Sequence, residues 1–300
     1  QDCRGKLLSE GVFYPFKNER QDGLTTVKWI RSQAWSNGKI ASWGGSYVGY
    51  TQWAISDVLD VVTAELTSAN IYELLYLDGL FSLATAFNWG LIVDSKTVNP
   101  IPPQKILNSY TILPLSVADD STYKDNAFIN DWLAHDSYDD YWKAMNHRGI
   151  TNSAVISFAG WYDIFLMPQI EDFIALNEEA KTKSRLIVGP WCHGSQSLTN
   201  DYGKKTGHKG KFIRQFINAQ LKGSDIDVAG TGYKDKKFNL FVMERNEYFG
   251  CDVWPPKSTT LTEYFIGPDT YFSPRPPQSQ GELNFTYDPI NPYPNKGGTF

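Results

Sequence analysis

A serine between glycines lies in the segment Trp43-Gly44-Gly45-Ser46-Tyr47-Val48-Gly49. A short strand-like run, Lys39 to Trp43, leads into this segment, and a helix-like run from Tyr50 to Ser56 follows it. This order is the local plan of a nucleophile elbow, in which a serine is held on a tight turn between a strand and a helix. The segment therefore predicts an α/β fold with a reactive serine at the end of a strand.

The spacing of the glycines leaves two interpretations open. Gly44 lies two residues before Ser46, where a Cβ would collide with the turn of an elbow. The second glycine of the usual pattern would stand at position 48, but Val48 is there and glycine follows at Gly49. Taken alone, the segment predicts either a nucleophile elbow or an ordinary Gly-Gly-Ser loop that opens a helix.

Composition limits the classes of protein to consider. The chain has 300 residues, enough for a large core and for two domains, and its net charge of −5 comes from intermixed signs. Nothing points to a nucleic-acid or membrane surface, and no apolar run is long enough to cross a bilayer. The three cysteines and four histidines show no metal-ligand or disulfide-framework spacing, so no metal and no cofactor are expected.

Strand-like and helix-like runs alternate along much of the chain. Strands are predicted at 39–43, 61–66, 153–159 and 185–188, with helices between them, which favours a largely parallel sheet. The region from about 69 to 147 breaks this rhythm and predicts a mostly helical cap; the alternative is ordinary helices that continue the α/β pattern. We expect residues 1–232 to form the α/β domain. No helical period returns after Gly232, so residues 233–300 are predicted to begin an all-β sandwich.

Two later residues could complete a serine nucleophile. Serine needs a base within hydrogen-bond reach and an acid that orients this base. Asp163 follows the predicted strand 153–159, and His193 follows the strand 185–188. Each has an ordinary alternative, a helix N-cap for the aspartate and a loop position for the histidine. However, the order Ser46, Asp163, His193 is that of the triad in α/β hydrolases, which predicts a catalytic role for all three.

Several motifs make nearly the whole chain resemble the CocE/NonD hydrolases, the group of cocaine esterase and glutaryl aminocephalosporanic acid acylase, which is related to X-prolyl dipeptidyl-peptidases. The motifs are Gln1-Asp2-Cys3-Arg4-Gly5, Gly44-Gly45-Ser46-Tyr47-Val48-Gly49, Asp131-Trp132-Leu133-Ala134-His135, Gly160-Trp161-Tyr162-Asp163 and Gly189-Pro190-Trp191-Cys192-His193. The late glycine fits this family, whose elbow reads G-x-S-Y-x-G.

The resemblance implies an α/β-hydrolase fold with a helical cap, followed by a jelly-roll domain. It implies that Ser46, His193 and Asp163 form the triad and that the backbone N–H of Tyr47 is one half of the oxyanion hole. The family's other half is a tyrosine upstream of Gln1. The first strands of the family's sheet and the end of its jelly roll are also missing, so the resemblance implies a chain truncated at both ends.

The substrate is predicted only as a class. In the related α-amino-acid ester hydrolases an acidic pair follows the triad aspartate, whereas Ile164 and Phe165 hold these places here. This favours an apolar or aromatic acyl group, with Trp191 as a third pocket residue; the alternative for Phe165 is plain packing under a helix. The expected substrate is a small ester, an amide or a short peptide.

Three functions remain open at this point. The first is an esterase or acylase, the second is an X-Pro dipeptidyl-peptidase, and the third is a ligand-binding protein on an inactive hydrolase scaffold. Homo-oligomer formation is left open, and the sequence does not identify a compartment.

Overall fold

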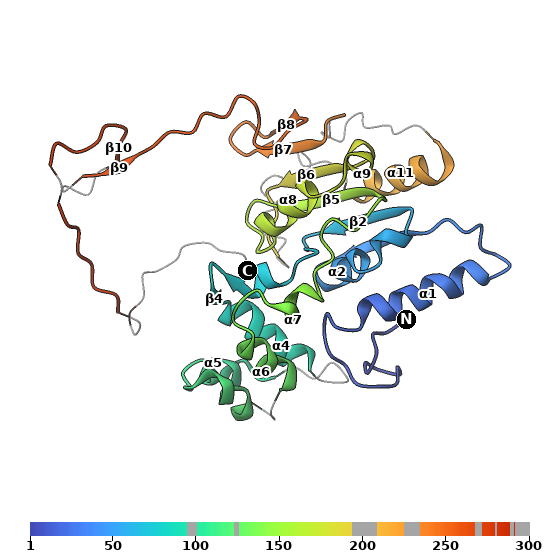
Figure 1. Cartoon of the computed structure of the whole chain (residues 1–300), viewed down its shortest axis with the longest axis horizontal. Coiled ribbons are helices and arrows are strands. Elements are labelled where there is room, and N and C mark those ends of the chain that lie inside the picture. The colour runs from blue at the N-terminus through green and yellow to red at the C-terminus, as the bar shows by residue number, and fades with distance from the viewer. Residues whose placement is uncertain are drawn as a thin grey trace.

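A six-stranded sheet is the centre of the structure, a computed structural model that describes residues 1–94, 101–122, 126–193, 209–224, 235–267, 272–279, 281–288 and 291 (Figure 1). The strands follow the order β1 (Ala41–Gly45), β2 (Val61–Glu65), β5 (Ala154–Gly160), β6 (Arg185–Gly189), β7 (Phe238–Val242) and β8 (Glu247–Cys251). All neighbours are parallel except β7 and β8, which are antiparallel. The predicted α/β fold with a mainly parallel sheet is thus confirmed.

Helices cover both faces of this sheet, which explains why β5 is buried along its whole length. Alternate side chains of a strand point to opposite faces. Val155 and Ala159 pack toward one set of helices, whereas Ile156 and Phe158 pack toward α11 (Lys209–Lys222). The first set comprises α1 (Glu19–Ser32), α2 (Tyr47–Trp53), α8 (Leu166–Ile174) and α9 (Glu178–Lys183).

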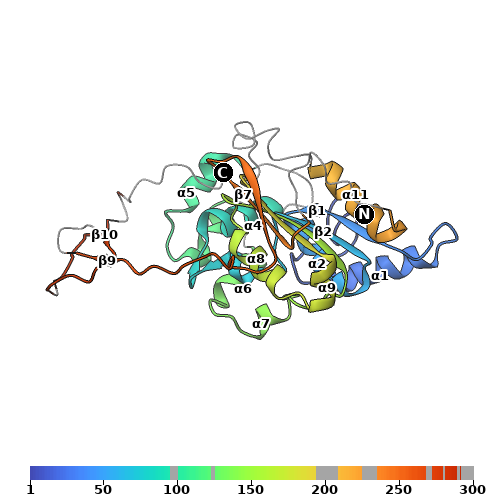
Figure 2. The same cartoon turned by 90° about the horizontal axis from the view of Figure 1, so that it is seen from above.

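The segment between β2 and β5 is mostly helical, as the sequence predicts for residues 69–147. Its elements are α3 (Tyr72–Leu75), a hairpin of β3 (Tyr76–Leu77) and β4 (Leu80–Phe81), a π-helical turn η2 (Leu83–Phe87), α4 (Asn88–Val93), α5 (Pro103–Ser109), η3 (Leu115–Val117), η4 (Asp119–Ser121), α6 (Ala127–Ala134) and α7 (Asp140–Lys143). These elements share an aromatic core with Phe16, Tyr50 and Phe165. Figures 1 and 2 show α4, α5 and α6 grouped beside the sheet rather than in it.

One ion-pair network ties this helical segment to the sheet side of the molecule. Arg148 Nε donates to Asp172 Oδ1 at 2.8 Å, and its Nη1 donates to Glu73 Oε1 at 2.7 Å. Asp172 lies in α8, and Glu73 lies in α3. Because the Asp172 side chain is fully buried, this carboxylate depends on Arg148 and on the backbone N–H of Ala69 for its partners.

The end of the chain differs from the expected sandwich. The predicted boundary at 232–233 lies outside the described residues. The segment predicted to open the sandwich does contain the strand β7, but this strand pairs with β6 in the main sheet, and β8 follows it there. The reason is that Phe238 and Leu240 bury their side chains in the same cluster as α8.

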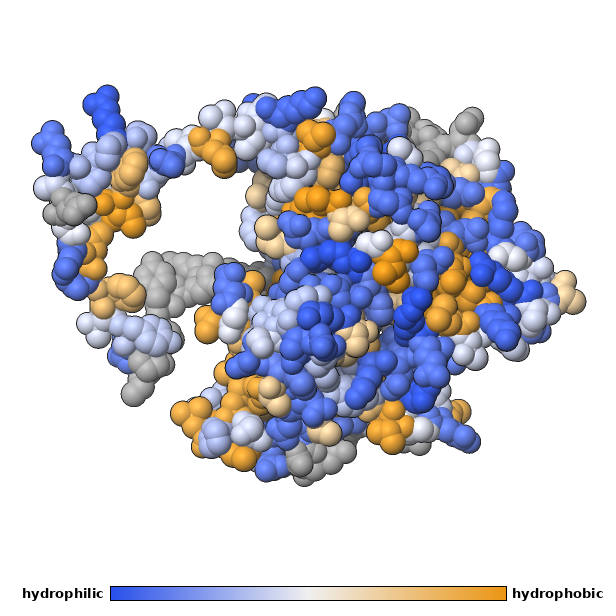
Figure 3. All heavy atoms as spheres, viewed as in Figure 1, coloured by the Kyte–Doolittle hydropathy of each residue, from blue (hydrophilic) through white to orange (hydrophobic). Residues whose placement is uncertain are grey.

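Beyond β8, the described residues form one short pair, β9 (Phe265–Ile266) with β10 (Phe272–Ser273), and no jelly roll. Figure 1 shows this pair well away from the sheet. On the face drawn in Figure 3, hydrophilic residues are interspersed with smaller hydrophobic groups.

Candidate active site

Ser46 lies on a sharp turn between a strand and a helix. It is the single residue between β1 and α2, and its backbone has φ 56° and ψ −131°. A non-glycine residue with positive φ stores about 1–3 kcal/mol of strain, so surrounding contacts must hold it. Its N–H donates to the carbonyl oxygens of Glu65 at 2.9 Å and Leu66 at 3.2 Å, which fixes the turn to the end of β2.

Close packing explains both glycines of the elbow. A Cβ on Gly44 would lie 2.8 Å from Val48 Cγ2, and a Cβ on Gly49 would lie 2.5 Å from Thr67 Cγ2. The Thr67 hydroxyl donates to the carbonyl oxygen of Ser46 at 2.7 Å, so this side chain must stay where it is. The glycine therefore comes three residues after the serine, because that is the helix position that faces Thr67.

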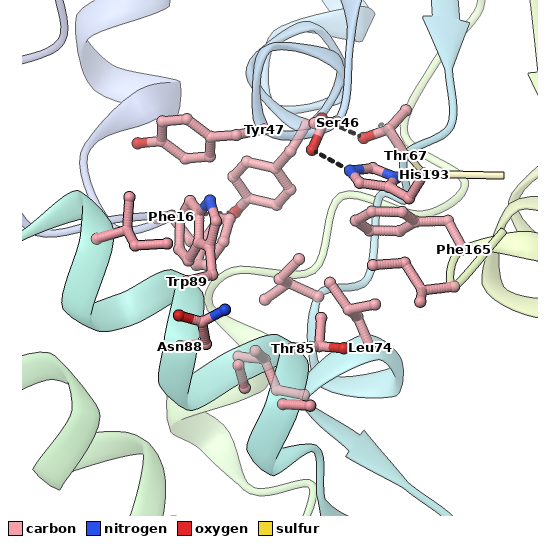
Figure 4. Close-up of a pocket in the computed structure, with 17 residues that line it drawn as sticks. Phe16, Ser46, Tyr47, Thr67, Leu74, Thr85, Asn88, Trp89, Phe165 and His193 are labelled. Carbon is pink, nitrogen blue, oxygen red and sulfur yellow. Dashed lines mark hydrogen bonds between the residues drawn. The ribbon is translucent and has the colours of Figure 1, made fainter. Parts of the chain in front are cut away.

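The structure brings the three predicted residues together. Ser46 Oγ lies 2.9 Å from His193 Nε2, and His193 Nδ1 lies 2.9 Å from Asp163 Oδ2 (Figure 4). They meet because β1, β5 and β6 are parallel, and the carboxyl ends of parallel strands lie at one edge of a sheet. The Asp163 side chain is fully buried, whereas His193 is partly exposed.

The Asp163 carboxylate contacts both the histidine and the backbone at the entry to α8, although the N-cap position of α8 is Phe165. Its Oδ2 faces His193, and its Oδ1 accepts the backbone N–H of Phe165 at 2.9 Å, at the entry to α8. The two loops are also joined directly, since the Tyr162 N–H donates to the Trp191 carbonyl at 3.1 Å. These bonds fix the carboxylate relative to the imidazole.

A cavity of about 180 Å³ opens beside Ser46. Its described lining contains no lysine, arginine or carboxylate. The principal lining residues are Phe16, Tyr47, Leu74, Trp89, Ile164 and Phe165, together with Ser46 and His193 (Figure 4). Such a lining favours an apolar group next to the serine.

Two of the three predicted pocket residues, Ile164 and Phe165, line this cavity, and the Phe165 ring lies 5.4 Å from the His193 ring. Trp191 lies elsewhere. It packs on Phe158, with 5.9 Å between ring centroids, in the cluster on the α11 face. Phe16 and Trp89, whose rings stack at 5.3 Å, also line the cavity and were not predicted. No local signal marks them, because they come from an N-terminal loop and from α4.

Tyr47 contributes in two ways to the cavity. Its backbone begins α2, and its side chain lines the cavity. The hydroxyl of this side chain donates to Glu19 Oε1, outside the cavity lining. Burial raises the pKa of the Glu19 carboxyl, and the hydrogen bond from Tyr47 opposes this rise. Thus the ring of Tyr47 is held by a buried carboxyl behind the cavity wall.

The described residues form neither a candidate metal site nor a helix that could span a membrane. The described ranges contain no cluster of three or more histidine, cysteine, aspartate or glutamate side chains that could hold a metal ion. In the same part of the chain, no helix is both long and apolar enough to span a bilayer.

A serine elbow after one parallel strand, with an aspartate and then a histidine after later strands, is the arrangement of an α/β hydrolase. The family model for X-Pro dipeptidyl-peptidase (S15 family) matches residues 1–195. The chain therefore belongs to this family of serine hydrolases, and its resemblance to the CocE/NonD hydrolases is confirmed.

Individual relatives agree with this assignment. The chain is 28% identical to cocaine esterase from Rhodococcus sp. (strain MB1 Bresler), over 100% of this chain and 58% of that protein. An aminopeptidase from a marine sediment archaeon, Thaumarchaeota archaeon, superposes with a TM-score of 0.75 at 18% identity, over 98% of this chain and 54% of that one. A CocE/NonD family hydrolase from Staphylococcus aureus gives 0.59 at 20% identity, over 87% and 42%. The chain spans about half the length of the curated relatives it matches.

Proposed function

We propose that this chain carries the active site of a serine hydrolase that cleaves carboxylic esters or amides through an acyl-enzyme. The observation that supports this proposal is the hydrogen-bonded series Ser46, His193 and Asp163 beside an apolar cavity. Ser46 Oγ attacks the carbonyl carbon while its proton passes to His193 Nε2. His193 then gives this proton to the leaving alcohol or amine. In the second half of the reaction, water attacks the acyl-enzyme and gives its proton to His193, which returns it to Ser46 Oγ as the acid leaves. Asp163 holds the imidazole in the tautomer that accepts at Nε2.

The charge that develops on the carbonyl oxygen needs donors nearby. We assign the backbone N–H of Tyr47 as one of them, because the first amides of a helix have no partner within the helix and Tyr47 begins α2. One such donor typically contributes about 3–4 kcal/mol to transition-state stabilisation. Phe165 lies beside His193 and Ile164 lines the same cavity, which favours an apolar or aromatic acyl group there.

The second candidate is an X-Pro dipeptidyl-peptidase, which the name of the matched family suggests. Such an enzyme binds a free amino terminus and needs a carboxylate for it. The cavity wall, as far as the described residues form it, carries none, which favours the esterase. A comparison of an X-Pro p-nitroanilide with a p-nitrophenyl ester separates the two, because only a peptidase should turn over the anilide efficiently.

The third candidate, a binding protein on an inactive scaffold, is tested together with the main proposal. We expect Ser46→Ala to lower hydrolysis of p-nitrophenyl esters by about 10³-fold or more and to abolish labelling by a fluorophosphonate. Ser32→Ala is the matched control, because Ser32 is exposed at the end of α1 and, among the described residues, its hydroxyl hydrogen-bonds only to the neighbouring Trp29 and Gln33. Labelling of the parent chain rules out the inactive scaffold. Undiminished turnover by Ser46→Ala would overturn the proposed function.

A further inference from the structure

Asn88 differs from the other side chains around the cavity. Its amide lies at the wall across from Ser46 and His193 (Figure 4). Its Oδ1 is shielded from solvent, and no atom of the described residues hydrogen-bonds to it. An unpaired buried amide oxygen is unfavourable for folding alone. The other end of the same amide, Nδ2, faces the cavity in Figure 4, where an oxygen of a ligand can accept from it.

The backbone before Asn88 explains how this amide reaches the cavity. The π-helical turn η2 runs directly into α4, and Thr85, Asn88 and Ile92 from this continuous segment all line the cavity. Residues three, four and seven apart share one helix face, so the segment presents a single wall to the cavity. Single π-helical turns are frequent at functional sites. The wall therefore carries two polar groups, the Asn88 amide and the Thr85 hydroxyl, in otherwise apolar surroundings.

We propose that Asn88 determines specificity by binding a hydroxyl group at the far end of the acyl group. The Nδ2 of the amide donates, and the oxygen of a hydroxyl group accepts from it. A charged end group does not fit, because the described lining offers no opposite charge to pair with it. The preferred acyl group is thus neutral, apolar along its length and hydroxylated at its end. This inference rests on the proposed function and names its substrate class.

The test compares p-nitrophenyl esters that differ by one hydroxyl: 3-phenylpropanoate with 3-(4-hydroxyphenyl)propanoate, and benzoate with 4-hydroxybenzoate for a shorter reach. With the full chain, we expect the hydroxylated ester of at least one pair to be favoured about tenfold in kcat/KM. Comparing this ratio between variants cancels the intrinsic reactivity of the esters.

Asn88→Leu keeps the size of the side chain and removes both hydrogen-bonding atoms. We expect the preference for the hydroxylated ester to disappear or to reverse in this variant. Asn108→Leu is the matched control, because Asn108 is exposed on α5, outside the cavity, and this variant should keep the preference. A thermal unfolding curve for each variant shows that it is folded.

A binding measurement separates this inference from the proposed function. Tryptophan fluorescence of Ser46→Ala, with Trp89 in the cavity wall, reports binding of 4-propylphenol and propylbenzene without turnover. If no ester is hydrolysed but the phenol binds more tightly only when Asn88 is present, the proposed function fails and the Asn88 contact stands. If the esters are hydrolysed but neither assay shows a preference that Asn88→Leu removes, this inference is overturned and the proposed function stands.

Discussion

Replacing Gly49 with alanine should damage the serine elbow from behind. The new Cβ would lie 2.5 Å from Thr67 Cγ2, 2.6 Å from its Cβ and 2.8 Å from its Oγ1. Thr67 is fully buried, and its hydroxyl holds the carbonyl of Ser46, so it cannot turn away without loss. The substitution therefore pushes α2 away from the segment after β2. This displaces Ser46, which lies directly before α2 and is held by Thr67.

The size of the effect follows from three contributions. Inserting a methyl group into a packed site costs about 1–3 kcal/mol, and weakening the Thr67 hydrogen bond costs about 1 kcal/mol. Alanine returns about 1 kcal/mol through its better helix propensity. We expect a net loss of about 1–3 kcal/mol in the free energy of unfolding. The loss in kcat should be larger, about 10²-fold, because a displacement of about 1 Å at a catalytic group can have this effect.

Denaturant unfolding and kcat with a p-nitrophenyl ester measure the two effects. Gly210→Ala in α11 is the matched control, since its Cβ would meet nothing within 4 Å, and we expect it to be neutral or slightly stabilising. In a Thr67→Ser background, which lacks the nearest atom Cγ2, Gly49→Ala should cost less. If Gly49→Ala behaves like Gly210→Ala in both assays, Thr67 does not determine the position of the glycine.

Two further predictions concern stability. Burial lowers the pKa of His147 to about 4, below its ordinary value near 6.5, so the unfolded chain binds more protons between these values. The free energy of unfolding should therefore fall by about 3 kcal/mol as the pH drops from 7 to 4. Denaturant unfolding of His147→Gln across this pH range should lack this part of the fall. Parallel curves of stability against pH for the two proteins would contradict the lowered pKa of His147. Arg148→Met leaves the buried Asp172 carboxylate without its main partner and should lower the free energy of unfolding by about 3–5 kcal/mol. Lys143→Met is the control and should change stability little, because the ion pair of Lys143 with Asp140 is exposed. Equal effects of the two substitutions would refute the role of the Arg148 network.

The elbow and the placement of Asp163 and His193 were accessible to sequence reasoning because their signals are local. A strand buried on both faces is a nearly continuous apolar run, and β5, interrupted only by Ser157, is such a strand. A polar residue directly after such a run lies at the carboxyl edge of the sheet, where parallel strands bring their ends together. Chain order then links the serine, the aspartate and the histidine without any knowledge of distances.

The walls of the cavity could not be predicted in this way. Phe16 and Trp89 stack although they are far apart in the sequence, and no periodicity connects them. Trp191 shows the opposite failure. It lies two residues before His193, but its side chain turns to the α11 face, and proximity in sequence does not tell which face of a sheet a loop residue joins. The Asp78-Gly79 dipeptide between β3 and β4 is a hairpin signal that was not used in the prediction.

The irregular spacing of the elbow glycine shows where local and tertiary information meet. Gly44 is explained within the turn, by the contact its Cβ would make with Val48. Gly49 is explained by Thr67, a residue that follows β2 and is close only because β1 and β2 pair in register. The same end of β2 supplies the carbonyl oxygens of Glu65 and Leu66 that hold the N–H of Ser46. The position of the glycine after a nucleophile therefore depends on which side chain the neighbouring strand places against the helix. A glycine pattern that departs from the usual one can thus belong to the same turn.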